Sequence, residues 1–217
     1  MTRPLLSRLT YYPSDQLLTA LMPHEIHEAP LTYLIQRLSS VVQGIPFGKN
    51  DGALKIQALS NTQILGDTID AVPDLLVRMD YTPTISHLVA SHHCFVLECA
   101  FTQSNTDVMR KLNAYVESFP NIVAVSKITI KETSYTAPND QSGMAQAYRP
   151  AIAIGDWMAR RKKRTAMGPV TRHGFTFIDV TAIDVHIWVR SAEDRINVAE
   201  FNTSTQAFAQ GVSISFM

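Results

Sequence analysis

The chain has 217 residues, of which 46% are hydrophobic, and its 19 basic and 19 acidic side chains give a formal net charge of zero. This composition is that of a globular protein, and a neutral chain has no global field to attract a polyanion. No apolar run reaches the roughly 18 residues of a membrane-spanning helix, and the N-terminus lacks the apolar core of a signal peptide. We therefore expect one intracellular domain over residues 1–217, cytoplasmic or nuclear, with no membrane partner.

The first third of the chain predicts one clear helix. Residues 1 to about 22 show no dominant period, so an irregular or partly helical lead-in is expected. Apolar residues in Leu31–Val42 recur at helical spacing. Pro30 is expected in the first turn of this helix, which ends before Gly44 and Pro46.

Three strands, a helix and a fourth strand are expected next. The three strands are ALKIQALS from Ala53, a strand near Ala71–Met79 that ends at the YTPT turn, and CFVLECAF from Cys94. SNTD at Ser104–Asp107 is typical of a helix N-cap, and Pro120 ends the helix that follows. NIVAVSKITIK is then the fourth strand.

The last third begins with ETSYTAPNDQSGMAQAYRP, a polar segment without a period that predicts a long loop. FTFIDVTAIDVHIWVR further on predicts one long strand or two short ones. We expect an α/β fold with a central mixed sheet flanked by helices, and a C-terminal elaboration over about residues 145–217.

Cysteine and histidine residues give weaker indications. Cys94 and Cys99 are five residues apart in one predicted strand, which places them on opposite faces as reduced thiols of an intracellular protein. His24 and His27 have the spacing of two metal ligands on one helical face, but no third ligand accompanies them in a zinc motif. Phosphate-binding loops of the GxGxxG and GxxxxGK types are absent from the sequence.

Two acids stand inside apolar runs on strands that we expect to be neighbours, Asp74 and Glu98. A charged carboxylate in a buried strand costs several kcal/mol unless a partner compensates it. Two carboxylates held close together repel each other unless they share a proton or a cation. Mg²⁺ commonly binds one or two protein carboxylates together with phosphate oxygens of a substrate. The two acids therefore predict a site for Mg²⁺ or Mn²⁺.

The residues around these acids resemble a known superfamily. Pro73–Asp74, followed about two dozen residues later by the strand that carries Glu98, resembles the PD-(D/E)XK nucleases. LECAFTQSNTDVMRKLNAY is particularly similar to the Uma2-like branch and related predicted nucleases. The resemblance covers about residues 25–131 and implies a restriction-endonuclease-like core in the order helix, three strands, helix, strand. Periodicity alone predicts the same order.

The resemblance also implies roles for particular residues. The superfamily pattern places a lysine two positions after the glutamate, where this chain has Ala100; in several branches the next helix supplies that lysine, and Lys111 fits this position. Asp74 and Glu98 would then hold the metal, and Lys111 would position or activate the attacking water. A third acid is expected from Glu28 ahead of the first helix, with Glu25 as the second choice. The backbone carbonyl of Cys99 is expected to be a further metal ligand. Gln103 is expected to bind phosphate or water.

The favoured function is metal-dependent hydrolysis of phosphodiester bonds in nucleic acid. The basic run RRKKR is expected to contact the nucleic-acid backbone through Arg160, Arg161, Lys162, Lys163 and Arg164. One alternative is a catalytically silent relative that binds nucleic acid or protein. Another is a scaffold or assembly protein without chemistry. Dimerisation is common in the superfamily, so a homodimer is a further expectation.

Overall fold

The computed structural model of the protein describes residues 8–21, 25–44, 52–83, 89–101, 103–133, 169–172, 175–191, 194–199, 208–209 and 213–215. Contacts divide the chain into two compact units, of which the first comprises Met1–Thr129 and Val185–Val212 and the second Ile130–Asp184 and Ser213–Met217. Most of the predicted long loop and the basic run 160–164 lie outside the described residues.

A mixed sheet is the framework of the first unit. Its strands are β3 (Gly52–Leu59), β6 (Leu75–Pro83), β7 (Ala90–Ala100), β8 (Ala124–Glu132), β11 (Val180–Val189) and β12 (Phe208–Ala209). The order across the sheet is β12-β11-β8-β7-β6-β3. Strands β3, β6 and β7 form an antiparallel meander, whereas β7 and β8 are parallel. The later residues of β8 and the earlier residues of β11 belong to the second unit.

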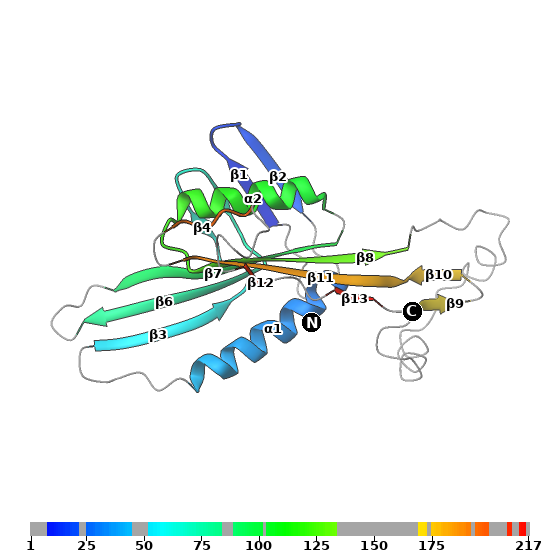
Figure 1. Ribbon diagram of the computed structural model, residues 1–217, viewed down its shortest axis with the longest axis horizontal. Coiled ribbons are helices and arrows are strands. Elements are labelled where there is room, and N and C mark those ends of the chain that lie inside the picture. Colours follow the sequence, from blue (N-terminus) through cyan, green and yellow to red (C-terminus); the bar gives the residue numbers. More distant parts are fainter. Residues whose placement is uncertain are drawn as a thin grey trace, which may run out of the picture. The chain divides into compact units, whose positions relative to one another are not determined.

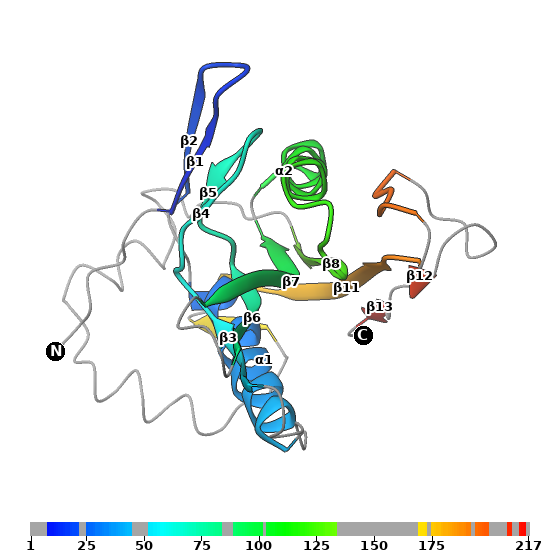
Figure 2. The same ribbon diagram turned by 90° about the vertical axis from the view of Figure 1, so that its left-hand side faces the viewer.

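Two helices cover the two faces of this sheet. Helix α1 (Glu25–Gln43) and helix α2 (Asn105–Ser118) lie on opposite sides of it (Figures 1 and 2). Helix α2 is the crossover that joins the parallel strands β7 and β8, as a parallel pair requires. The predicted α/β class, with a mixed sheet flanked by helices, is confirmed. No helix in the described part of the chain is long and apolar enough to span a membrane.

A second, smaller sheet lies in the same unit. It consists of β1 (Arg8–Tyr12), β2 (Leu17–Leu21), β4 (Ile64–Leu65) and β5 (Asp70–Ala71), in the order β2-β1-β5-β4. The expectation of an irregular or helical lead-in is therefore wrong. Thr10 and Tyr12 on one face are buried, but Leu9, Tyr11 and Leu18 are large apolar side chains exposed to solvent. Apolar residues on both faces conceal the alternation that reveals most strands.

The first helix begins earlier than its apolar pattern predicts. Helix α1 starts at Glu25, so Pro30 lies inside the helix instead of in its first turn, and Glu28 belongs to the helix instead of preceding it. A proline at this depth removes one backbone hydrogen bond of the helix. Acidic residues near the start interact favourably with the helix dipole and partly offset this cost.

Two predicted strands also have different ends. Strand β6 continues through part of the YTPT segment to Pro83, which pairs with Gly52 at the end of the ladder, where a proline is tolerated. The register between β6 and β7 shifts at Cys94, so the strict alternation expected between the two cysteines is interrupted there. The two cysteines are not joined in a disulfide; Cys99 is buried and Cys94 is half-buried.

Helix α2 begins where the sequence predicts. The Ser104 hydroxyl accepts a hydrogen bond from the Asp107 backbone N–H at 3.1 Å, which satisfies one of the unpaired donors of the first turn. The helix buries Val108, Leu112 and Tyr115 against the core. This core includes residues from β6, β7 and β8 and from the small sheet.

The second unit contains a short antiparallel pair, β9 (Val170–Arg172) and β10 (Phe175–Ile178). FTFIDVTAIDVHIWVR thus forms two strands, β10 and β11. Within this unit, β13 (Ser213–Ser215) pairs with the Ala182–Asp184 part of β11.

Replacing His93 with glutamine should flatten the dependence of stability on pH. Burial and then the positive charge of Arg78 lower the pKa of His93 below its ordinary value of 6.5, with His92 acting in the same direction and Asp80 opposing it. Below pH 6.5 the unfolded chain therefore binds more protons at this position than the native state, so the free energy of unfolding rises with pH in that range. Urea unfolding between about pH 5 and about pH 8 tests this. Identical slopes for wild type and His93→Gln would contradict it.

Candidate active site

The two buried acids lie at one end of the ladder between β6 and β7. Leu75 of β6 pairs with Leu97 of β7. Asp74 is the residue before Leu75, and Glu98 is the residue after Leu97. Asp74 is 4% exposed and Glu98 is 2% exposed. The antiparallel register therefore brings both acids to the same corner of the sheet, and each needs compensation for its burial.

Glu98 is compensated by two side chains of α2. The Lys111 ammonium lies 2.9 Å from one carboxylate oxygen, and the Tyr115 hydroxyl donates to the other at 2.8 Å. Lys111 is only 1% exposed. Residues four apart on a helix lie on the same face, which lets both side chains reach one carboxylate. The ion pair and the hydroxyl account for a charged residue in the interior of β7.

Asp74 is held by a different set of groups. Its Oδ2 accepts the backbone N–H of Cys99 at 2.6 Å and lies 3.0 Å from Nε2 of His27. The other ring nitrogen of His27, Nδ1, is 2.9 Å from Oε1 of Glu28. Glu28, expected as a third acid, thus reaches Asp74 through the histidine ring.

Lys111 also reaches the backbone just ahead of Asp74. The Lys111 ammonium also donates to the backbone carbonyl of Val72 at 3.5 Å. Lys111 and Tyr115 reach Glu98 from α2, whereas His27 reaches Asp74 from α1 on the opposite face of the sheet. The corner therefore joins both helices to the ends of β6 and β7.

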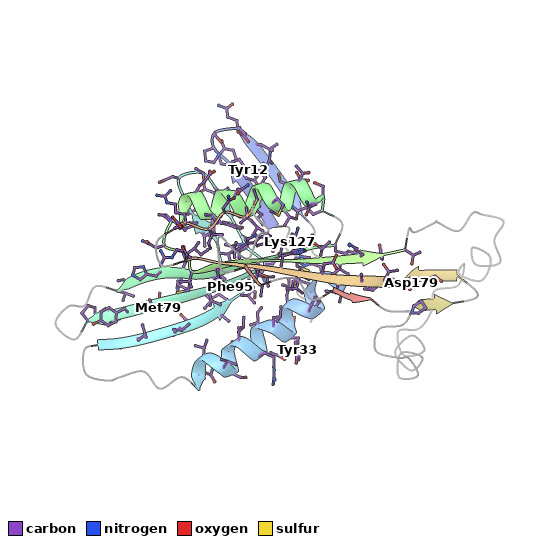
Figure 3. All side chains as sticks on the ribbon, in the orientation of Figure 1. Tyr12, Tyr33, Met79, Phe95, Lys127 and Asp179 are labelled. Atoms are coloured by element: carbon purple, nitrogen blue, oxygen red, sulfur yellow. The ribbon has the colours of Figure 1, made fainter. Side chains whose placement is uncertain are left out.

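Lys127 is a buried residue near the site that the sequence reasoning missed. It is 5% exposed and pairs with Glu98 in the parallel register of β7 and β8. Its ammonium donates to the side-chain oxygen of Asn105 at 2.6 Å, beneath the first turn of α2 (Figure 3). The sequence does indicate this residue, because Lys127, like Glu98, is a charged residue inside an apolar strand.

A pocket of about 630 Å³ lies between the β1–β2 hairpin and α2. Polar and charged residues dominate its lining, including Tyr12, Asp15, Asn105, Arg110 and Glu117. The Arg110 guanidinium lies 4.2 Å from the ring centre of Tyr12, and burial raises the pKa of the Tyr12 hydroxyl. The lining does not include Asp74, Glu98 or Lys111. Asp74, Glu98 and Lys111 are buried, and the charges of Lys111 and Glu98 act on the hydroxyl of Tyr12, which lines the pocket.

The other residues expected in the site are Cys99, Gln103, Glu25 and the basic run. Cys99 supplies its N–H to Asp74 and pairs with Ile128 in β8. Gln103 is half-buried between β7 and α2. The side chain of Glu25, residue His24 and the basic run Arg160, Arg161, Lys162, Lys163 and Arg164 lie outside the described residues.

The donor set suits a hard cation better than zinc. Within the described ranges, no three His, Cys, Asp or Glu side chains are grouped to hold a metal ion. Mg²⁺ needs only one or two protein carboxylates when a substrate phosphate supplies further oxygens, and each carboxylate oxygen has two lone pairs. Asp74 and Glu98 offer oxygens of the type that Mg²⁺ or Mn²⁺ prefers, and both oxygens of Glu98 also accept hydrogen bonds from Lys111 and Tyr115. Both ring nitrogens of His27 already face carboxylates, which disfavours the zinc alternative.

The chain was also compared with known proteins. No protein-family model matches it, and neither a curated protein nor a solved structure gives a match.

Proposed function

We propose that the protein hydrolyses phosphodiester bonds of nucleic acid with a divalent metal, as a PD-(D/E)XK-type nuclease with a restriction-endonuclease-like core. The observation that carries this proposal is the position of Lys111. Ala100, where the superfamily pattern has its lysine, is buried in the core, while Lys111 from the next helix reaches the Glu98 carboxylate. A buried lysine at a buried acid, with a second acid on the neighbouring strand end, is the arrangement that this chemistry needs.

In this proposal Asp74 and Glu98 hold Mg²⁺ or Mn²⁺, with the Cys99 carbonyl as a further ligand. The bound ion supplies an activated water and neutralises charge on the phosphate. Lys111 balances the charge of Glu98 and would position or activate that water. Gln103 and the basic residues 160–164 would contact phosphate groups. The proposed location is inside the cell, and the proposed assembly is a homodimer.

A second candidate is a catalytically silent protein that binds nucleic acid or another protein through the same scaffold. Its support is that both oxygens of Glu98 already accept hydrogen bonds from Lys111 and Tyr115, and that these side chains are almost fully buried. A phosphodiester reaches them only after neighbouring groups move. Tyr11 and Leu18, which pair across the β1–β2 hairpin, are exposed apolar residues of the kind that bind a protein partner.

Asp74→Asn should lower the rate of metal-dependent cleavage by about 100-fold or more, because the amide removes the charge that holds the cation. The assay uses labelled single- and double-stranded DNA and RNA with Mg²⁺ or Mn²⁺. Asp67→Asn is the matched control, since Asp67 is an exposed acid outside the site. Equal cleavage by wild type and Asp74→Asn would reject the site. Absence of cleavage by folded wild type would favour the silent candidate.

A further inference from the structure

The His27 ring lies between two carboxylates at the start of α1. Consecutive residues on a helix do not face each other, yet Glu28 approaches Nδ1 of His27 to 2.9 Å. Nε2 of the same ring lies 3.0 Å from Asp74, which is 47 residues away in the sequence. The His27 side chain is 14% exposed and that of Glu28 is 34% exposed. The ring is therefore largely buried, with both of its nitrogens in contact with acids.

Oδ2 of Asp74 receives its contacts from two different elements. The Cys99 N–H comes from β7, and the His27 ring comes from α1. Rotation of the carboxylate about its Cβ–Cγ bond would break both contacts together. The pair of donors thus fixes the plane of the carboxylate and the direction of its second oxygen.

We infer that His27 is a positioning residue that holds the Asp74 carboxylate in the orientation in which it binds a divalent metal; this inference rests on the proposed function. Groups that hydrogen-bond to a metal-ligating side chain set its orientation, and their loss typically weakens metal binding by about 10–100-fold. Glu28 then acts on Asp74 through the ring. This role differs from the third metal ligand that the sequence predicts for Glu28.

The inference predicts that His27→Leu weakens Mn²⁺ binding by about 10–100-fold in a calorimetric titration of the full chain. His27→Gln, which keeps an N–H donor in reach of Asp74, should recover part of the affinity. His93→Gln is the matched control, because His93 is half-buried but packs against Phe119, away from Asp74. A purely structural role for His27 would lower the unfolding temperature and leave the affinity for Mn²⁺ unchanged.

A second readout needs no metal. The side-chain carboxyl carbon of Asp74 should change its NMR resonance in His27→Leu and keep it in His93→Gln. Unchanged Mn²⁺ affinity or an unchanged Asp74 resonance in His27→Leu would overturn the inference. A wild-type protein that binds no Mn²⁺, but whose Asp74 resonance moves in His27→Leu, would overturn the proposed metal chemistry and leave the positioning of Asp74 by His27 in place.

Discussion

Glu98→Gln should lower the free energy of unfolding by about 3–5 kcal/mol, because the Lys111 ammonium would remain buried without its counter-charge. Lys111→Met should cost a similar amount, since it leaves the Glu98 carboxylate with the Tyr115 hydroxyl as its side-chain donor. The double variant Glu98→Gln/Lys111→Met removes both charges and should recover most of the loss, because a neutral buried pair carries no uncompensated charge. Urea unfolding of the four proteins measures this coupling.

A surface ion pair provides the control for this cycle. Lys131 and Asp184 approach to 2.6 Å, but the Lys131 side chain is 58% exposed. Lys131→Gln, at the exposed partner, should therefore change the free energy of unfolding by no more than about 1 kcal/mol. If the losses of the Glu98 and Lys111 single variants simply add in the double variant, the two side chains do not form the ion pair that the site requires.

Gly66→Ala should lower the free energy of unfolding by about 1–3 kcal/mol, because the new methyl group has no room. A Cβ at Gly66 would lie 2.5 Å from Cβ of Ser118 and 3.0 Å from the Phe119 ring. Ser118 cannot easily move aside, since its hydroxyl accepts the backbone N–H of Thr68 at 3.0 Å and contacts the Thr68 hydroxyl at 2.6 Å. Urea unfolding of the variant gives the loss.

Gly44→Ala is the matched control for this substitution. A Cβ at Gly44 would meet the Val41 carbonyl at 3.4 Å, so stability should change little. Gly66→Ala/Ser118→Gly should lose less than the sum of its single variants, because the second change removes the closest atoms. A neutral Gly66→Ala would show that the loop before β5 is not held close to the end of α2.

Most of the first unit follows from local sequence signals. The N-cap at Ser104 predicts the start of α2, and the apolar run around Glu98 predicts β7, because both patterns are strong over a few residues. The sequence does not predict the hairpin of β1 and β2, because Leu9 and Leu18 on its exposed face are as apolar as the residues on its buried face. The sequence predicts too late a start for α1, because proline is usually found in the first turn of a helix, whereas Pro30 lies inside this one.

The cost of burying a charge singles out residues of the candidate site in the sequence, but it does not identify their partners. Asp74 and Glu98 stand out because carboxylates in apolar strands need compensation, and the resemblance to the nuclease superfamily indicates Lys111 on the next helix. His27 and Tyr115 were not recognised as their partners, because these contacts depend on how the helices pack on the sheet. Lys127 was overlooked although it lies in an apolar strand in the same way as Glu98.

Lys111 and Tyr115, one turn apart on α2, each donate a hydrogen bond to a different oxygen of the Glu98 carboxylate. A slide of α2 by one residue, which is about 1.5 Å and 100° of rotation, would pull Lys111 and Tyr115 away from Glu98 simultaneously. A rigid-body shift of α2 would therefore remove both side-chain partners of the buried glutamate together and leave its charge uncompensated.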